Sequence, residues 1–237
     1  MNKLLMGAAL SSVFCISAAV HAGLKVTPIQ LYVSEKNNQR SATVTFDYTG
    51  SDAPKIFEAT AVKWSQNEKG EDVYIPDPDI LINPKNFVLQ PESKQVVRVG
   101  FPQPVRAMNL KEEGTWRVIF NETPPVADQS AMNFLFNISM PLFAGEQKSA
   151  SLAPSISYRA NRLIVTLQNK AASHIQIKDL AIEDASGKAI ATSNNMTYLL
   201  ANKQNEFDMG QVKLESQQKY TLKINTDKGD KPLEIVL

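Results

Sequence analysis

The sequence predicts an all-β protein made of two β-sandwich domains, on three observations. Apolar residues alternate with polar ones along many short runs, and no window sustains the 3.6-residue apolar period of a helix. Clusters of turn-forming residues separate these runs at short intervals, which is typical of antiparallel sandwiches. A small, polar stretch at residues 144–151 divides the strand-rich sequence into a longer first part and a shorter second part.

The first 22 residues have the features of a cleaved signal peptide. Lys3 supplies a positive charge, residues 4–20 form a short apolar run, and residues 20–22 make a small-residue cleavage site. The run is too short and too rich in Ala and Ser for a membrane span, and no later run reaches 18 apolar residues. We therefore expect residues 1–22 to be removed on export to the periplasm of a Gram-negative cell, without membrane insertion.

The chain that follows the leader has balanced charge and no cysteine, because Cys15 lies in the leader. It keeps 24 basic and 24 acidic residues in about 215 positions. This balance argues against electrostatic capture of nucleic acid or anionic lipid as the main activity. Without disulfides the stability must come from core packing, which a chain of this length allows.

Residues 23–145 carry the alternating runs that predict the strands of a first domain. Each run places three or four apolar side chains on one face, as a half-buried strand requires. These faces are Ala42/Val44/Phe46/Tyr48, Val97/Val99/Phe101 and Trp116/Val118/Phe120. Turn clusters at residues 36–39, 49–52, 67–70 and 76–79 separate the runs.

A further alternating run near the end of this part carries the functional question. It places four apolar side chains on one side of an extended chain, and prolines bound it on both sides. The side chains are Met132, Phe134, Phe136 and Ile138. Such a strand either closes the core of its own sheet or offers its apolar side to another chain, and periodicity alone leaves both readings open.

Residues 150–237 predict a second, smaller sandwich. Leu163, Val165 and Leu167 share a face there, and turn clusters occur at residues 184–187 and 227–230. The two predicted domains meet at the small, polar stretch that ends the first part.

No set of residues in the sequence makes a catalytic or metal site. His174 is the one histidine outside the leader, so no pair of histidines can hold zinc and no cysteine can assist. A lone histidine in this setting is usually a hydrogen-bonded strand residue, and neither a nucleophile elbow nor a phosphate-binding glycine loop is present. We expect a protein that is not an enzyme and that needs no metal or cofactor.

Several segments of the first part occur together in a characteristic order. They are residues 26–31, 40–46, 80–91, 95–100 and 116–125, followed by the apolar row and Pro141-Leu-Phe143. Together these segments resemble the periplasmic chaperones of the chaperone–usher pathway, which assemble pili and other fimbrial fibres. The resemblance covers most of the first domain, whereas the second part matches loosely, through residues 173–180 and 198–200.

The resemblance implies two immunoglobulin-like domains in a boomerang arrangement. It also implies partners: exported fimbrial or pilus subunits that lack the last strand of their own sandwich, and an outer-membrane usher that receives them. The family lends a strand of its first domain to the subunit, and here that donor strand would be the row Met132, Phe134, Phe136 and Ile138.

The sequence departs from the family where the subunit's C-terminal carboxylate is usually held. In place of the usual Arg and Lys, the matching positions carry Gln30 and, approximately, Pro141. This departure, together with residues 62–66, makes the chain resemble the divergent or archaic branch of the chaperone family. The remaining candidate cations are Arg98, Arg117 and Lys25, although a structural ion pair, for instance of Arg98 with Glu122, explains an arginine equally well.

Other classes of protein fit the sequence less well. A structural pilin or adhesin subunit would have a single incomplete sandwich of about 150 residues and a free N-terminal extension. A carbohydrate-binding module would need an exposed aromatic platform, but Trp64 and Trp116 both lie in alternating strands and are expected to be buried. A hydrolase would need partners for His174.

Overall fold

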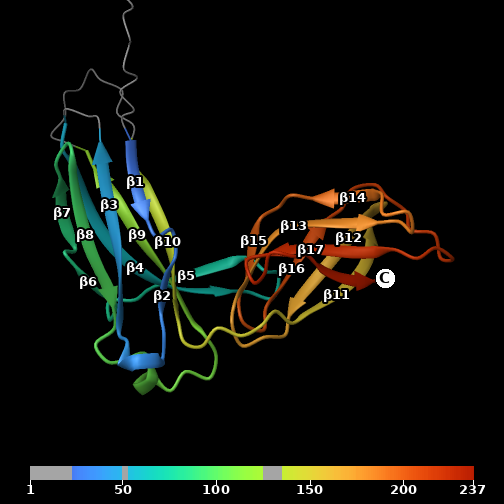
Figure 1. Cartoon of the computed structure of the whole chain (residues 1–237), viewed down its shortest axis with the longest axis horizontal. Coiled ribbons are helices and arrows are strands. Elements are labelled where there is room, and N and C mark those ends of the chain that lie inside the picture. The colour runs from blue at the N-terminus through green and yellow to red at the C-terminus, as the bar shows by residue number, and fades with distance from the viewer. Residues whose placement is uncertain (1–22, 50–52, 125–134) are drawn as a thin grey trace, which may run out of the picture.

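The computed structural model describes residues 23–49, 53–124 and 135–237, and these residues form two β-sandwiches that meet at an angle (Figure 1). The predicted fold class, two immunoglobulin-like sandwiches in a boomerang arrangement, is confirmed. The predicted leader and two members of the apolar row, Met132 and Phe134, lie outside the described residues. No helix among the described residues is long and apolar enough to cross a membrane.

The first sandwich contains two sheets. One sheet has the order β1 (Gly23–Thr27), β3 (Ser41–Thr49), β8 (Ser93–Gly100) and β6 (Leu81–Asn83). The other has the order β2 (Leu31–Val33), β10 (Asn137–Ala144), β9 (Gly114–Thr123), β4 (Lys55–Gln66) and β5 (Asp72–Pro76), and β7 (Asn86–Leu89) also pairs with β4. Two short 3-10 turns, η1 (Lys36–Asn38) and η2 (Val105–Met108), lie together at one end of the first sandwich, at the bottom of Figure 1.

The core of the first sandwich follows the predicted alternation. Phe46 of β3 is fully buried, and its ring centroid lies 4.8 Å from that of Phe120 in β9 and 5.6 Å from that of Phe57 in β4. Because successive side chains alternate faces, Val44 and Phe46 of β3 point into the sandwich. There they pack with the inward-facing side chains of β4 and β9 in the opposite sheet. These aromatic contacts hold the two sheets together.

The second sandwich is smaller. One sheet has the order β11 (Leu152–Arg159), β12 (Arg162–Asn169) and β16 (Gln204–Asp208). The other has the order β14 (Ala189–Ser193), β13 (Ile175–Glu183), β17 (Thr221–Thr226) and β18 (Leu233–Val236), with β15 (Thr197–Leu199) paired to β13. Its own core contains the predicted row Leu163, Val165 and Leu167. The predicted domain limits, 23–145 and 150–237, stay a prediction.

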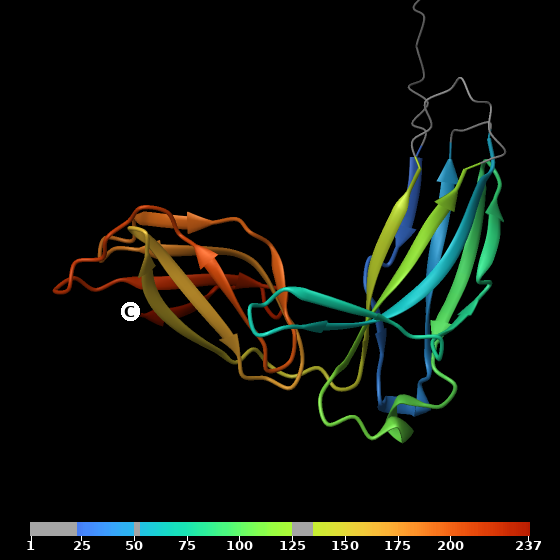
Figure 2. The ribbon, with the colours of Figure 1, turned by 180° about the vertical axis from the view of Figure 1, so that it is seen from behind.

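The β4–β5 hairpin reaches from the first sandwich to the second (Figure 2). Near its base, Trp64 packs with Phe143 of β10 and Leu200 of the second sandwich. Further out, the Gln66 side chain donates to the Tyr198 carbonyl at 2.8 Å and accepts the Leu200 N–H at 3.0 Å. Trp64 is thus buried as expected, but between the sandwiches rather than in a sandwich core.

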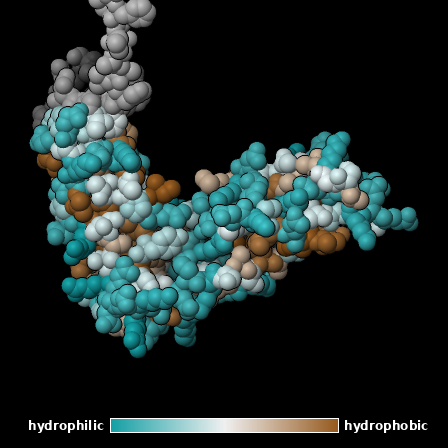
Figure 3. Space-filling view, viewed as in Figure 1, coloured by the Kyte–Doolittle hydropathy of each residue, from teal (hydrophilic) through white to brown (hydrophobic). Residues whose placement is uncertain are grey.

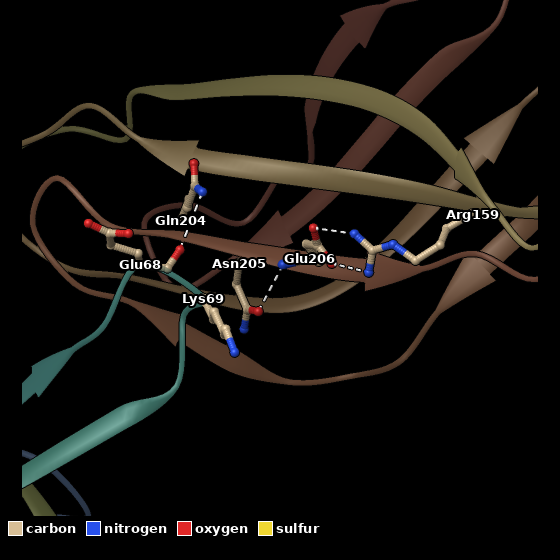
Figure 4. A pocket seen from close by; sticks show the side chains of 6 residues that line it. All are labelled: Glu68, Lys69, Arg159, Gln204, Asn205 and Glu206. Carbon is tan, nitrogen blue, oxygen red and sulfur yellow. Dashed lines mark hydrogen bonds and ion pairs between the residues drawn. The ribbon is translucent and has the colours of Figure 1, made fainter.

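The hairpin tip rests on β16, beside a cavity of about 410 Å³ (Figure 4). The Gln204 side chain donates to the Glu68 carbonyl at 3.4 Å, and Arg159 pairs with Glu206 at the far wall. Gly70 comes so close to β16 that a Cβ there would lie 2.6 Å from the Gln204 carbonyl oxygen. The tip therefore contacts the second sandwich through its backbone.

Candidate functional site

Strand β10 has an open backbone edge along part of its length. On one side it pairs with β9 in antiparallel register over all of Asn137–Ala144. On the other side it pairs with β2, in parallel register, only over residues 142–144. Residues 137–141 therefore have no second neighbouring strand among the described residues, and alternate N–H and C=O groups of this stretch are available to another chain.

The apolar row predicted for a donor strand leaves the sandwich core along β10. Met140 and Leu142, which continue the row, are buried in the core, and Ile138 packs partly against it. Phe136, just before the strand, is 43% exposed. Both readings of the row therefore describe part of it: Ile138 belongs to the protein's own core, whereas the Phe136 ring extends beyond that core.

An ion pair fixes the backbone at Phe136. The Glu122 carboxylate, with a side chain only 6% exposed, accepts the Phe136 N–H at 3.0 Å and pairs with Lys55 at 2.9 Å. The Glu122 N–H donates in turn to the Phe136 carbonyl at 2.8 Å. The ion pair suggested between Arg98 and Glu122 is wrong, because Lys55 of the adjacent strand β4 takes that position. Only the β4–β9 pairing, which sequence patterns do not give, brings Lys55 to Glu122.

Two of the candidate cations lie away from β10. Arg98 is exposed on β8 in the opposite sheet, opposite Thr43 and Asn83. Lys25 is exposed on β1 of the same sheet, opposite Asp47. The structure therefore does not bring either one together with the open edge or with the cleft between the sandwiches.

Arg117, the third candidate cation, lies in that cleft. It occupies β9 opposite Pro141 of β10, and its guanidinium carbon lies 4.0 Å from the Trp64 ring centroid and 5.7 Å from that of Tyr198. Its Nε is buried and has no hydrogen-bond partner among the described residues. A stacked guanidinium keeps its charge and its fork of donors, so Arg117 can still receive an anionic group in its plane.

Gln30 bridges the two sandwiches from the loop between β1 and β2. Its amide nitrogen donates to the Tyr198 hydroxyl at 2.6 Å, and its amide oxygen accepts the Tyr32 hydroxyl at 3.0 Å. Pro141 is buried beside it. Gln30, Pro141 and Arg117 are therefore close to the junction, but the Gln30 amide already has partners on both sides.

A buried histidine links the sandwiches beneath this cleft. His174 Nδ1 lies 2.6 Å from Glu113 Oε2, and the same oxygen accepts the His174 backbone N–H at 2.8 Å. The imidazole stacks on Phe143, with ring centroids 3.6 Å apart. The sequence predicted a hydrogen-bonded strand residue. The hydrogen bonds are present, but His174 lies just before β13 and its partner comes from the first sandwich. The sequence signal that could have indicated this contact is the pair Glu112-Glu113 directly before the buried strand β9.

Both ring nitrogens of this histidine have polar neighbours. Tyr32 donates its hydroxyl proton to Gln30, and the same hydroxyl oxygen lies 3.3 Å from His174 Nε2. A second carboxylate, Asp227, lies 3.6 Å from Nε2. Burial and the carboxylates of Asp227 and Glu113 raise the pKa of Tyr32, which keeps its hydroxyl protonated.

Comparison with known proteins assigns a family to this fold. Residues 23–145 match the family model for the N-terminal domain of PapD, described as a pili and flagellar-assembly chaperone. The chain belongs to this family of assembly chaperones. No match was found among curated proteins.

Solved structures with the same fold cover both sandwiches. The chaperone CsuC of Acinetobacter baumannii archaic Csu pili, in complex with CsuE, is 18% identical, with a TM-score of 0.64 over 91% of this chain and 98% of that one. The Salmonella enterica chaperone SafB, in complex with the SafA pilin, is 15% identical, with a TM-score of 0.57 over 93% and 99%. The E. coli chaperone DraB is 15% identical, with a TM-score of 0.56 over 91% and 98%.

Proposed function

We propose that this protein is a periplasmic chaperone that holds exported fimbrial or pilus subunits by lending them strand β10 and then delivers them to an outer-membrane usher. The observation that carries the proposal is the open edge of β10 at residues 137–141, next to a Phe136 side chain that leaves the core. The solved complexes of CsuC with a tip adhesion subunit and of SafB with a pilin support subunits as the partner class.

Strand lending has a direct physical basis here. A subunit that lacks its last strand exposes an apolar groove with unpaired backbone groups, which would otherwise promote aggregation. The open edge of β10 supplies ladder hydrogen bonds, and Phe136 with the predicted donor residues Met132 and Phe134 fills the groove. Each such side chain contributes about 1.5–3 kcal/mol when buried, less the cost of ordering both chains. Completion of the subunit fold supplies the energy, so no nucleotide is required.

Arg117 is the candidate best placed to hold a carboxylate of the subunit. It lies in the cleft at the level of Pro141, where the open part of β10 ends, whereas Arg98 and Lys25 lie on the opposite sheet. Gln30 would contribute an uncharged hydrogen bond only if its contact with Tyr198 opened. The guanidinium offers charge assistance that the amide cannot.

Co-expression with candidate fimbrial subunits tests the proposal. Phe136→Asp should leave the circular dichroism spectrum and the unfolding midpoint nearly unchanged but abolish co-elution of a soluble subunit, because a carboxylate cannot enter an apolar groove. Val96→Asp is the control, since Val96 is also a large exposed apolar residue (52%, against 43% for Phe136) but lies on β8 of the opposite sheet. Capture by Phe136→Asp at the wild-type level would contradict strand lending.

The same assay tests the anchor. Arg117→Gln should weaken capture. Arg98→Gln, which makes the same change at an exposed arginine of the opposite sheet, should not. Equal capture by both variants would remove Arg117 from the site.

A further inference from the structure

Strand β5 is a second exposed edge of the sheet that contains β10. The sheet order is β2-β10-β9-β4-β5, and β5 pairs with β4 alone among the described residues. All five of its residues are exposed, including three consecutive large apolar ones: Val73 at 38%, Tyr74 at 49% and Ile75 at 59%. On the face shown in Figure 3, apolar surface forms several separate patches.

The hydrogen bonds of the hairpin show which backbone groups of β5 point outward. The Asp77 N–H donates to the Ala61 carbonyl at 3.2 Å, and the Asn67 N–H donates to the Glu71 carbonyl at 3.0 Å. Antiparallel pairing alternates, so the odd-numbered residues between them bond to β4. Tyr74 therefore directs both its N–H and its C=O away from β4, ready for an additional strand.

The central part of this edge lacks the features that usually protect an exposed strand. Natural edges carry a lysine, a proline, a bulge or a covering segment. In β5 the central residues Val73–Ile75 carry no charge and the register with β4 is regular, whereas the proline of the strand, Pro76, lies at its end. The charges lie at its ends instead: Glu71 and Asp72 precede the apolar residues, and Asp77 and Asp79 follow them.

A cavity of about 420 Å³ opens where β5 ends. Its lining contains the buried apolar side chains of Ile80, Phe101 and Trp116 together with the acidic residues Asp77 and Asp79. Asp77 accepts the Trp116 indole N–H at 2.7 Å and the Asp79 backbone N–H at 3.1 Å, which leaves the exposed Asp79 carboxylate at the mouth. An apolar side chain followed by a cation would fit this combination.

We propose that β5 and the adjoining cavity bind an extended segment of a second protein that alternates apolar residues and carries Lys or Arg at its ends. A second copy of this chain fits poorly, because antiparallel pairing about Tyr74 would oppose the acidic ends of both strands. A subunit on β10 would not cover this edge, because two strands separate them, or roughly 14 Å at ordinary strand spacing. The partner can therefore bind while a subunit is held.

A labelled synthetic peptide tests the proposal on the purified protein without any subunit, so its result is independent of strand lending. The probe is acetyl-Lys-Val-Thr-Val-Thr-Leu-Lys-amide, followed by fluorescence anisotropy and by amide shifts of ¹⁵N-labelled protein. We expect saturable binding with shifts at residues 72–79, and weaker binding of the same peptide with glutamate at both ends. Shifts centred on β10 or β18, or no saturable binding, would overturn the proposal.

Substitutions in β5 test whether the peptide binds at this edge. Ile75→Lys should weaken binding about tenfold by placing a charge in the edge, and Asp79→Lys several-fold. Tyr74→Pro gives a second route, because it removes the outward N–H and leaves the β4 ladder intact. Val236→Lys on the exposed edge strand β18 is the control and should bind normally. Equal binding by all variants would overturn the proposal. Self-association that Ile75→Lys abolishes would also overturn it, because a second copy of this chain would then be the occupant of the edge.

Discussion

Two of the contacts between the sandwiches differ in chemistry. One is a buried polar contact: Glu113 of the first sandwich holds His174 of the second, and Asp227 lies on the other side of the ring. The other, along the β4–β5 hairpin, combines the packing of Trp64, the close approach of Gly70 and two hydrogen bonds of the uncharged Gln66 side chain. The Phe143 ring lies between them, stacked on His174 and part of the Trp64 cluster.

The different chemistry of the two contacts indicates that they have separate roles in positioning the residues of the cleft. A buried hydrogen-bonded carboxylate is directional and tolerates little displacement, since a buried polar group left without its partner is costly. The hairpin contact consists mainly of packing and hydrogen bonds of an uncharged amide, so it can loosen gradually without leaving a buried charge unpaired. We therefore expect the polar contact to set the angle between the sandwiches and the hairpin to limit motion about it. Three substitutions can separate these roles.

Removal of the carboxylate should have the largest effect. Glu113→Ala removes the carboxylate that bonds the buried ring and the backbone N–H of His174, and it also removes a partner of the exposed Gln147 side chain. We expect a loss of about 3 kcal/mol in the free energy of unfolding, because two buried polar groups lose their partner. Urea denaturation measures this loss, and small-angle X-ray scattering should show a broader range of interdomain angles.

Glu112→Ala provides the control for this substitution. Glu112 is the neighbouring residue, but it is exposed and pairs with Asn202 at the surface. Its loss should cost no more than about 1 kcal/mol. If Glu113→Ala were as mild as Glu112→Ala, the polar contact would not determine the arrangement of the sandwiches.

The fold could be predicted from the sequence because alternation reports burial directly. Val44, Phe46, Val97 and Val99 are all fully buried, as their spacing indicates. The same rule misplaced Trp64, whose alternation is real but whose face is covered by the other sandwich. Periodicity identifies a covered face, but it does not say which part of the molecule covers it.

The candidate site could be predicted only in part, because it depends on pairing between distant strands. The apolar row indicated a strand whose apolar side could be shared, and Phe136 is exposed there. The Lys55–Glu122 pair, by contrast, joins residues 67 positions apart, and Glu113 is 61 positions from His174. No local sequence pattern encodes these contacts. The partners of His174 and the roles of the candidate arginines could therefore be assigned only once the pairing of distant strands was known.

The second carboxylate of the polar contact should give a smaller, pH-dependent effect. Burial acts to raise the pKa of Asp227, but hydrogen bonds from His174 and the Gln176 N–H, with the charge of Lys228, hold that pKa below its ordinary 3.8. A lowered native pKa stabilises the fold above the ordinary value, and this stabilisation disappears as the pH falls through the native pKa. Asp227→Asn should therefore cost about 1.5–2 kcal/mol at pH 7.

The pH profile distinguishes this charge effect from a simple loss of packing. The asparagine keeps an acceptor for the Gln176 N–H, so the stability difference from wild type should shrink as the pH is lowered below about 4. Unfolding midpoints measured from pH 7 to pH 3 provide the comparison. A difference that is constant over this range would show that the Asp227 charge does not stabilise the junction.

The smallest effect on stability should come from the hairpin tip, where a matched pair of glycines separates strain from contact. Gly70 and Gly187 both have φ of +81°, but a Cβ at Gly70 meets β16 whereas one at Gly187 meets open space. Alanine at either position should cost about 1 kcal/mol of backbone strain. Only Gly70→Ala should also lift the tip and speed amide exchange in β5. Equal exchange in the two variants would mean that the tip does not restrain the hairpin, and the polar contact would then hold the sandwiches without help from it.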